Sequence, residues 1–248
     1  MCEHCGCNTL SHHDHADGSD MHENHVGHSH ETHGRRSIEI QADLLAHNRS
    51  HADAVRRFLE ARGSRLVNII GSPGCGKTEL LAALIPLLDA NTVVIEGDLA
   101  TRNDADRIEK SGAPVYQIET GTACHLDAHE IEHALSHLPI VEETLVLVEN
   151  VGNLVCPSMF DVGESLRLVC LSVTEGVDKP EKYPISFREA NVAVITKADL
   201  LPYVDFDLER CRRLIEAVHP DMPVIVTSAK ETQSLKPLIE MLTGLWKR

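Results

Sequence analysis

The sequence has no long apolar run and no excess of basic residues. None of its stretches approaches the roughly 20 apolar residues that cross a bilayer, and its polar N-terminus has no apolar core of the kind found in signal peptides. A formal net charge of -15 at pH 7 does not provide the basic surface that binding to a phosphate backbone requires. These absences predict a cytoplasmic protein whose partners include neither a membrane nor a nucleic acid.

The sequence also lacks repeats of solenoid-like period. Its 248 residues, 42% of them hydrophobic, suffice for one substantial domain with a buried core and a tail. Metal-ligating side chains are abundant: there are 8 cysteines and 16 histidines, and nine of the histidines precede Arg35. In a chain without an export signal, such cysteines are better explained as metal ligands or reactive thiols than as disulfides.

Three regions follow from the distribution of polar and apolar residues. Residues 1–37 contain MCEHCGC and a histidine-rich stretch with almost nothing to bury, which predicts a disordered metal-binding tail. Residues 38–63 place apolar side chains between Ile40 and Leu59 near helical spacing, which predicts an amphipathic helix. Residues 64–248 are expected to form the main domain.

Short β-branched runs alternate with helical segments throughout this main domain. The runs are LVNIIG, TVVIEGD, PVYQIET, TLVLVEN, LRLVCLSV, VAVITK and PVIVTSA. Such alternation predicts the α/β class, with a mostly parallel sheet flanked by helices. The last segment, SLKPLIEMLTGLWKR, is expected to be a closing helix.

The first of these strands ends in a complete phosphate-loop motif, G-x-x-x-x-G-K-[ST]. The motif consists of Gly71, Ser72, Pro73, Gly74, Cys75, Gly76, Lys77 and Thr78. Its glycines let backbone N–H groups approach phosphate oxygens, and the N-terminus of the following helix favours their negative charge. Lys77 is expected to reach the terminal phosphates and Thr78 to ligate Mg²⁺. The strand-loop-helix context therefore predicts a nucleotide site.

Residues within the phosphate loop and at two other strand ends indicate which class of nucleotide-binding protein this is. Ser72 stands where the deviant phosphate loops of septum-site and nitrogenase-type ATPases carry an additional lysine, which disfavours those relatives. Cys75 occupies a free position of the motif and is interpreted as a packing residue, with a redox effect on nucleotide binding as the alternative. Two strand ends supply the carboxylates Asp98 and Glu149, which can hold Mg²⁺ or orient the attacking water.

Two later strand ends resemble the elements by which GTPases recognise guanine. They are Thr196-Lys197-Ala198-Asp199, of the [NT]-K-x-D type, and Thr227-Ser228-Ala229-Lys230, of the S-A-K type. The carboxylate of Asp199 can accept hydrogen bonds from guanine N1 and N2, where adenine offers no donors, and the stem of Lys197 can lie along the base. Threonine replaces the commoner asparagine at position 196, but the preference for GTP should survive because Asp199 carries it.

The extreme N-terminus offers three thiolates within six residues, those of Cys2, Cys5 and Cys7, on a backbone that Gly6 makes flexible. Such a cluster suits a soft or borderline divalent ion. A fourth nitrogen ligand, such as the chain amine after removal of Met1, would suit square-planar Ni²⁺, and tetrahedral Zn²⁺ fits as well. The residues leave both metals open.

A second group of candidate metal ligands consists of Cys124 and His125 in GTACHLDA and Cys156 in GNLVCP. By residue type alone they fit two core cysteines and a histidine at a helix start. Because Cys156 follows Glu149 by seven residues, a metal held there would be able to sense the state of the nucleotide.

Residues 129–133, HEIEH, match the H-E-x-x-H zinc motif of metalloproteases. A chance match is not rare in a chain so rich in histidine, and no third ligand is identifiable. His125, His129, His133 and His137 recur at i+4 spacing, which favours a solvent-exposed stripe on one helix face over peptidase chemistry. An adventitious metal site is the remaining alternative.

In their order along the chain, these elements resemble the hydrogenase nickel-incorporation GTPases, the HypB family. The matching segments are the cysteine cluster with its histidine-rich tail, GSPGCGKT, GDLATRNDADRI, GTACHLDA, ENVGNLVCP, TKAD and SAK. The resemblance implies a SIMIBI-class GTPase domain over residues 64–248, hydrolysis of GTP to GDP and phosphate, and a GTP-dependent homodimer. It also implies Ni²⁺ at the three N-terminal cysteines, and Ni²⁺ or Zn²⁺ at Cys124, His125 and Cys156 near the dimer interface.

The same resemblance names expected partners, a hydrogenase large-subunit precursor and a small nickel/zinc accessory protein of the HypA type. For the histidine-rich segment 12–33, metal storage or buffering is our hypothesis. Two alternatives stay open for the whole protein. One is a nickel storage or buffering protein with a regulatory nucleotide site, and the other is a GTPase that serves another nickel enzyme such as urease.

Overall fold

The computed structural model describes residues 31–98 and 103–246, and the chain divides into two units, Met1–Leu44 and Leu45–Arg248. Helix α1 (Glu31–Glu60) contributes its first turns to the first unit and its later turns to the second. It begins earlier than the predicted helix over residues 38–63 and ends three residues before it. The segment 1–30, with the predicted ligands Cys2, Cys5 and Cys7, lies outside the described residues.

The described residues of the second unit form one seven-stranded sheet of order β3-β2-β4-β1-β5-β6-β7, and each ladder between neighbouring strands is parallel. The strands are β1 (Arg65–Gly71), β2 (Thr92–Asp98), β3 (Val115–Glu119), β4 (Leu145–Glu149), β5 (Leu166–Ser172), β6 (Val192–Thr196) and β7 (Val224–Val226). Each strand coincides with one of the β-branched runs of the sequence. The predicted α/β fold is therefore confirmed.

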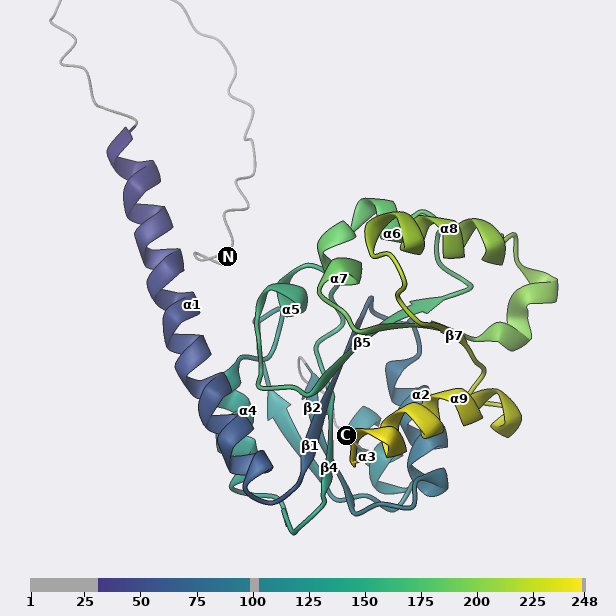
Figure 1. The fold of residues 1–248 in the computed structure, drawn as a ribbon, viewed down its shortest axis with the longest axis horizontal. Coiled ribbons are helices and arrows are strands. Elements are labelled where there is room, and N and C mark those ends of the chain that lie inside the picture. Colours follow the sequence, from purple (N-terminus) through teal and green to yellow (C-terminus); the bar gives the residue numbers. More distant parts are fainter. Residues whose placement is uncertain (1–30, 99–102, 247–248) are drawn as a thin grey trace, which may run out of the picture. The chain divides into compact units, whose positions relative to one another are not determined.

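Helices cover both faces of this sheet (Figure 1). The first face carries α2 (Lys77–Leu84), α3 (Asn103–Glu109) and α9 (Thr232–Thr243). The second face carries the end of α1, α4 (Ala128–Leu135), α7 (Pro184–Arg188) and α8 (Leu208–Val218). The remaining short elements are α5 (Cys156–Met159), α6 (Lys179–Lys182) and the 3-10 turns Ile85–Leu87, Ala198–Tyr203 and Gly244–Trp246.

Burial on both faces explains why the central strands are almost continuously apolar. Every residue of β4 and β6 is buried, and in β1 all but Arg65 are. Successive side chains of β1 alternate between the two faces, so Val67 packs toward α2 and α9 whereas Leu66 packs toward α1 and α4. Among the described residues, no helix combines the length and the hydropathy that crossing a membrane requires.

Parallel pairing brings the carboxyl ends of the strands, and hence the predicted functional motifs, to one edge of the sheet. In the register, Gly71 lies opposite Cys170, and Ile69 lies opposite Glu149. Segments that leave this edge carry the phosphate loop and the guanine-recognition elements. A ligand site at this edge is the usual arrangement in open parallel sheets.

The packing of α9 predicts how a substitution in this helix changes the free energy of unfolding. Leu238 is fully buried in the core that α2, α9 and the sheet share, whereas Lys236 on the same helix is exposed. Leu238→Ala should lower the free energy of unfolding by about 2–5 kcal/mol, because it removes buried methyl groups and leaves a cavity. Urea unfolding followed by circular dichroism measures the change. Lys236→Ala is the matched control and should stay within about 0.5 kcal/mol of the wild type; equal losses in the two variants would contradict this packing.

Candidate nucleotide and metal sites

The phosphate loop turns sharply between β1 and α2. Gly74 and Gly76 have φ values of 73° and 95°, a left-handed conformation that glycine adopts without the strain other residues would suffer. Gly76 is also the N-cap of α2, so the backbone N–H groups of the first turn face the loop. This conformation provides the donors that bind phosphate oxygens.

Lys77 and Thr78, the first two residues of α2, are both buried. The ammonium group of Lys77 lies 3.4 Å from the carbonyl oxygen of Gly71 and 3.5 Å from that of Ser72. These contacts are long for hydrogen bonds. The ammonium group therefore lies at the loop in weak contacts, which a phosphate oxygen, a stronger acceptor, can replace. The Thr78 hydroxyl donates to Glu149 Oε1 at 2.8 Å.

Glu149 ends β4 and is 5% exposed. On the neighbouring strand β2, the residue opposite Glu149 is Glu96. Glu96 is a second buried carboxylate, 2% exposed, and it was not among the predicted site residues. Glu96 lies inside a strand rather than at its end, so only the pairing of β2 with β4 reveals that the two are neighbours. Asp98 is the last residue of β2, and its side chain lies outside the described residues.

The residues predicted to recognise guanine line a pocket of about 290 Å³ beside the phosphate loop. Its wall combines Gly76, Glu79 and Leu80 of the loop and α2 with Thr196, Lys197, Asp199, Leu200, Thr227, Ser228, Ala229 and Lys230. The structure thus brings together the two elements that lie about thirty residues apart in the sequence.

Asp199 is held by two partners in this pocket. The Ser228 hydroxyl donates to Asp199 Oδ1 at 2.7 Å, and the ammonium of Lys230 lies 3.2 Å from Oδ2. The hydrogen bond from Ser228 is the main cause that lowers the pKa of Asp199, with Lys230 adding to it. The carboxylate is therefore ionised at neutral pH and can accept hydrogen bonds from a base.

Thr196 and Lys197 connect the base pocket to the phosphate loop. The Thr196 hydroxyl donates to the Cys75 carbonyl at 2.5 Å, and Lys197 Nζ donates to the Gly74 carbonyl at 2.7 Å. Threonine at position 196 thus makes a hydrogen bond to the loop itself. The side chain of Lys197 also lies over Gly76. A Cβ atom added at Gly76 would lie 3.4 Å from Lys197 Cε.

Cys75 points into the core beneath the loop and is fully buried. Burial raises the pKa of its thiol, and it does so more strongly for the neighbouring Cys170. A protonated, inaccessible thiol is a poor nucleophile. The arrangement agrees with the interpretation of Cys75 as a packing residue.

Lys179, which was not among the predicted site residues, also approaches the loop. Its ammonium group donates to Ser72 Oγ at 3.1 Å and pairs with Glu175 at 3.1 Å. Lys179 begins α6 after a run without a recognisable motif, so only the fold brings it to the phosphate site.

The metal-ligand candidates of the main domain converge although Cys156 is remote in sequence. The ligand atoms of Cys124, His125 and Cys156 all lie within 4.8 Å of one another, and Cys124 Sγ is 3.7 Å from His125 Nδ1. Among the described residues this is the one group of three or more such side chains that could hold a metal ion. Two thiols and an imidazole suit a borderline ion such as Zn²⁺ or Ni²⁺.

His125 is held in place by the aromatic ring of Phe160, with ring centroids 3.9 Å apart. Burial lowers its pKa, so the neutral imidazole, the form that binds metals, predominates at neutral pH. Phe160 was not recognised from the sequence, because no pattern links it to His125 across thirty-five residues.

The segment after Glu149 contacts both the loop that carries Cys124 and His125 and the phosphate loop. Asn150, 1% exposed, accepts a hydrogen bond from Leu126 N at 3.0 Å. Asn153 donates to the Cys124 carbonyl at 3.4 Å and forms a backbone bridge with Gly71. Gly152 packs against Pro73 so closely that a Cβ atom would lie 3.0 Å from Pro73 Cα. The ENVGN motif therefore contacts both candidate sites, which explains its physical role.

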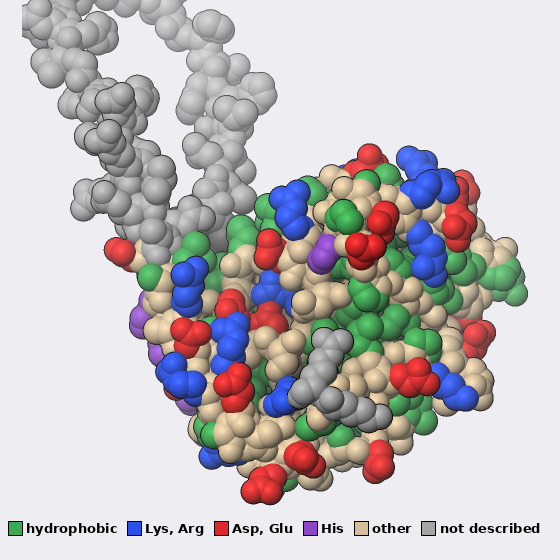
Figure 2. Space-filling model, in the orientation of Figure 1, with side chains coloured by type: hydrophobic (Ala, Val, Ile, Leu, Met, Phe, Trp, Pro, Cys, Tyr) green, Lys and Arg blue, Asp and Glu red, His purple; other side chains and the backbone are tan. Residues whose placement is uncertain are grey.

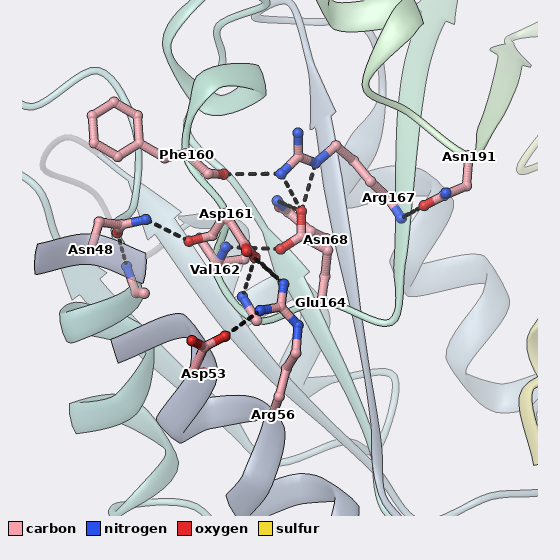
Figure 3. Close-up of polar contacts among 12 residues, drawn as sticks. Asn48, Asp53, Arg56, Asn68, Phe160, Asp161, Val162, Glu164, Arg167 and Asn191 are labelled. Carbon is pink, nitrogen blue, oxygen red and sulfur yellow. Dashed lines mark hydrogen bonds and ion pairs between the residues drawn. The ribbon is translucent and has the colours of Figure 1, made fainter. Parts of the chain in front are cut away.

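A polar network supports the same region from α1 (Figure 3). Asn48 donates to the Asp161 carbonyl at 2.7 Å and accepts from Ala128 N at 2.9 Å. Arg56 donates to the Asp161 carboxylate at 2.6 Å. Burial acts to raise the pKa of Asp161, but hydrogen bonds from Arg56 and the Gly163 N–H outweigh it and lower the pKa. Asn48 thus connects the segment after His125 with the segment after Phe160.

The H-E-x-x-H segment has a structural role instead of the geometry of a peptidase. Glu130 forms a capping box with Asp127, in which Glu130 accepts from Asp127 N at 2.9 Å and Asp127 accepts from Glu130 N at 2.8 Å. The predicted solvent-exposed stripe of histidines is confirmed for the exposed side chains of His129, His133 and His137, but it is wrong for His125, because α4 begins only at Ala128. His125 precedes the helix and faces Phe160.

Comparison with known proteins agrees with this geometry. Residues 65–226 match the family model described as CobW/HypB/UreG, nucleotide-binding domain. The hydrogenase maturation factor HypB of Azotobacter vinelandii is 46% identical over 202 residues, which cover 81% of this chain and 67% of that protein.

Two solved structures are similar throughout the domain. The crystal structure of HypB from Helicobacter pylori in complex with nickel has a TM-score of 0.78 and 36% identity, and the match covers 81% of this chain and 95% of that one. HypB from Archaeoglobus fulgidus has a TM-score of 0.75 and 37% identity, covering 82% and 100%. The chain described here belongs to the CobW/HypB/UreG family of P-loop GTPases and, within it, to the HypB proteins.

Proposed function

We propose that this chain is a GTP-hydrolysing nickel metallochaperone that promotes insertion of nickel into the large subunit of a [NiFe]-hydrogenase. The observation that carries the proposal is the contact of one segment, residues 150–153, with both the phosphate loop and the Cys124–His125–Cys156 cluster. The relatives that the chain resembles are hydrogenase maturation factors, and the Helicobacter pylori structure contains nickel.

In this proposal the nucleotide is bound from its two ends. Backbone N–H groups of the loop and Lys77 bind the phosphates, while Asp199 accepts hydrogen bonds from guanine N1 and N2 and Lys197 lies along the base. Thr196, Ser228, Ala229 and Lys230 shape the pocket around Asp199. Contacts within the fold hold these groups before the nucleotide arrives, which reduces the entropy lost on binding.

Hydrolysis transfers the γ-phosphoryl group to water. The water oxygen forms a bond to phosphorus as the bond to the β-phosphate oxygen of GDP breaks, and Lys77 stabilises the charge on the transferred group. Glu149 and Asp98 are proposed to orient the water or to hold Mg²⁺. Thr78 and Glu149 place a hydroxyl and a carboxylate oxygen 2.8 Å apart, which fits the oxygen ligands that Mg²⁺ prefers; when bound, Mg²⁺ would neutralise charge on the β- and γ-phosphates.

Nickel is the cargo in this account. Cys2, Cys5 and Cys7 are proposed to bind it at the N-terminus, and the Cys124–His125–Cys156 cluster to bind Ni²⁺ or Zn²⁺ near an interface between two GTP-bound copies. A small HypA-type accessory protein and the hydrogenase large-subunit precursor are the proposed partners. Hydrolysis would change the contacts of residues 150–153 and so the affinity of the cluster for its metal.

Lys77→Ala tests the enzymatic half of the proposal. Loss of the ammonium group should reduce GTP turnover to the background rate, because the other two described lysines at the loop are bound elsewhere on it, Lys179 to the Ser72 hydroxyl and Lys197 to the Gly74 carbonyl. Phosphate release at saturating GTP measures turnover, and Lys236→Ala serves as the surface control. Turnover of Lys77→Ala near that of the wild type would refute the assignment of the site.

Asp199→Ala tests the choice of base. The variant loses hydrogen bonds to a charged acceptor worth about 1.5–3 kcal/mol, so its affinity for GTP should fall by about tenfold to a hundredfold. Its affinity for ATP should change little. Displacement of a fluorescent nucleotide by GTP and by ATP measures both, and a parallel loss for the two nucleotides would contradict guanine recognition by Asp199.

The third test compares nickel affinity, by chelator competition, between the wild type and a variant with Cys2, Cys5 and Cys7 all changed to Ala. Loss of tight binding in this variant is the expected result, because three thiolates are the strongest ligands for a borderline ion in the chain. A variant with Cys124 and Cys156 changed to Ala is the comparison. Unchanged binding in the triple variant would assign the tight site to the Cys124–His125–Cys156 cluster or to the histidine-rich segment 12–33 instead.

A further inference from the structure

A separate pair of imidazoles lies at the end of α4, outside the sites described above. His133 belongs to the last turn of α4, and His137 follows in a turn where its N–H donates to the Ala134 carbonyl at 3.0 Å. Both side chains are exposed, and their Nε2 atoms face each other at 3.4 Å. Residues four apart on a helical turn share one face, which allows this approach.

The distance between the two nitrogens limits what can lie between the rings. It is long for a hydrogen bond between one protonated and one unprotonated nitrogen. Two imidazole nitrogens on a tetrahedral metal ion, each about 2.0–2.1 Å from the metal, would lie about 3.3–3.4 Å apart. The observed separation of the two Nε2 atoms therefore equals the distance expected between two histidine nitrogens bound to one metal ion.

The rings are also held in this orientation by a neighbour on the sheet. Tyr116 of β3, the edge strand, stacks on His137 with ring centroids 5.0 Å apart and an interplanar angle of 8°. It contacts His133 edge-on at 6.3 Å. Aromatic contacts of this kind restrict ring rotation, so less entropy is lost when a metal fixes the pair.

The other histidines of this surface belong to a different group. His129 packs against His51, with centroids 5.0 Å apart, and His51 in turn contacts His47 and bonds Glu132 at 2.6 Å. Figure 2 shows histidine side chains at the edge of the molecule. His129 is thus directed to α1 and leaves His133 to pair with His137.

We propose that His133 and His137 form a bidentate site for a divalent transition-metal ion of tetrahedral preference, with Zn²⁺ as the fitting ion. The site shares no residue with the Cys124–His125–Cys156 cluster and does not depend on the proposed function. A hollow of about 470 Å³, lined in part by Tyr116, Glu119 and His133, adjoins the pair. It leaves room for water or for ligands of a partner to complete the coordination, so the metal is exchangeable.

Histidine acylation by diethyl pyrocarbonate, mapped by peptide mass spectrometry, tests the site in the full chain. Adding Zn²⁺ should protect His133 and His137 together, whereas Mg²⁺, which prefers oxygen ligands, should protect neither. In His137→Ala the protection of His133 should be lost, because one imidazole no longer completes a chelate. In His129→Ala, the matched control on the same helix, it should persist.

A variant with Cys124 and Cys156 changed to Ala separates the pair from the cluster, and protection of His133 should survive in it. Circular dichroism checks that each variant is folded. Absence of protection by Zn²⁺ in the wild type, or protection of His133 that persists in His137→Ala, would overturn the proposal. Loss of protection in the cysteine variant would likewise show that the pair is not an independent site.

Discussion

Strands β1 and β4 pair in parallel, with Ile69 opposite Glu149, so the two strands reach the same edge of the sheet side by side. The segments that follow them are therefore neighbours: the phosphate loop after β1 and residues 150–156 after β4. The hydrogen bond from Thr78 to Glu149 and the bridge between Gly71 and Asn153 both depend on this pairing. A slip of the register by one residue would turn Glu149 to the other face of the sheet.

The same pairing brings the candidate metal ligands close to the phosphate loop. Asn150 and Asn153 hold the loop that carries Cys124 and His125, and the chain then enters α5, whose first residue is Cys156. Buried polar groups of this kind are costly to leave unpaired. A movement of residues 150–153 when the nucleotide changes would therefore alter the loop that carries the cluster, since the buried Leu126 N–H would lose its acceptor, Asn150 Oδ1.

The sequence predicted much of this because its signals are local. Seven β-branched runs predicted the sheet, and the spacing of Gly71, Gly76, Lys77 and Thr78 specified the phosphate loop. The division of the histidines was not predicted, because side-chain partners depend on tertiary contacts. Phe160 beside His125, and Glu96 beside Glu149, are likewise close only in the folded chain.

Some residues that contact the candidate sites were not predicted, and they differ in whether the sequence contained a signal for them. Asn150 and Asn153 stood within ENVGN, a motif already recognised as specific, so their importance was visible although their contacts were not. Lys179 and Asn48 carried no signal at all. Lys179 reaches Ser72 across more than a hundred residues, and Asn48 reaches Ala128 and Asp161 from α1. Only packing of α6 and α1 against the domain makes these contacts.

Coupling of the metal cluster to the nucleotide through residues 150–153 is the central claim. The direct test is the affinity for Ni²⁺ by chelator competition in a chain with Cys2, Cys5 and Cys7 changed to Ala, once with GDP and once with a non-hydrolysable GTP analogue. Coupling predicts affinities that differ by about fivefold or more between the two nucleotides, with a reciprocal effect of Ni²⁺ on nucleotide affinity. Equal affinities for Ni²⁺ in the two states would contradict the account.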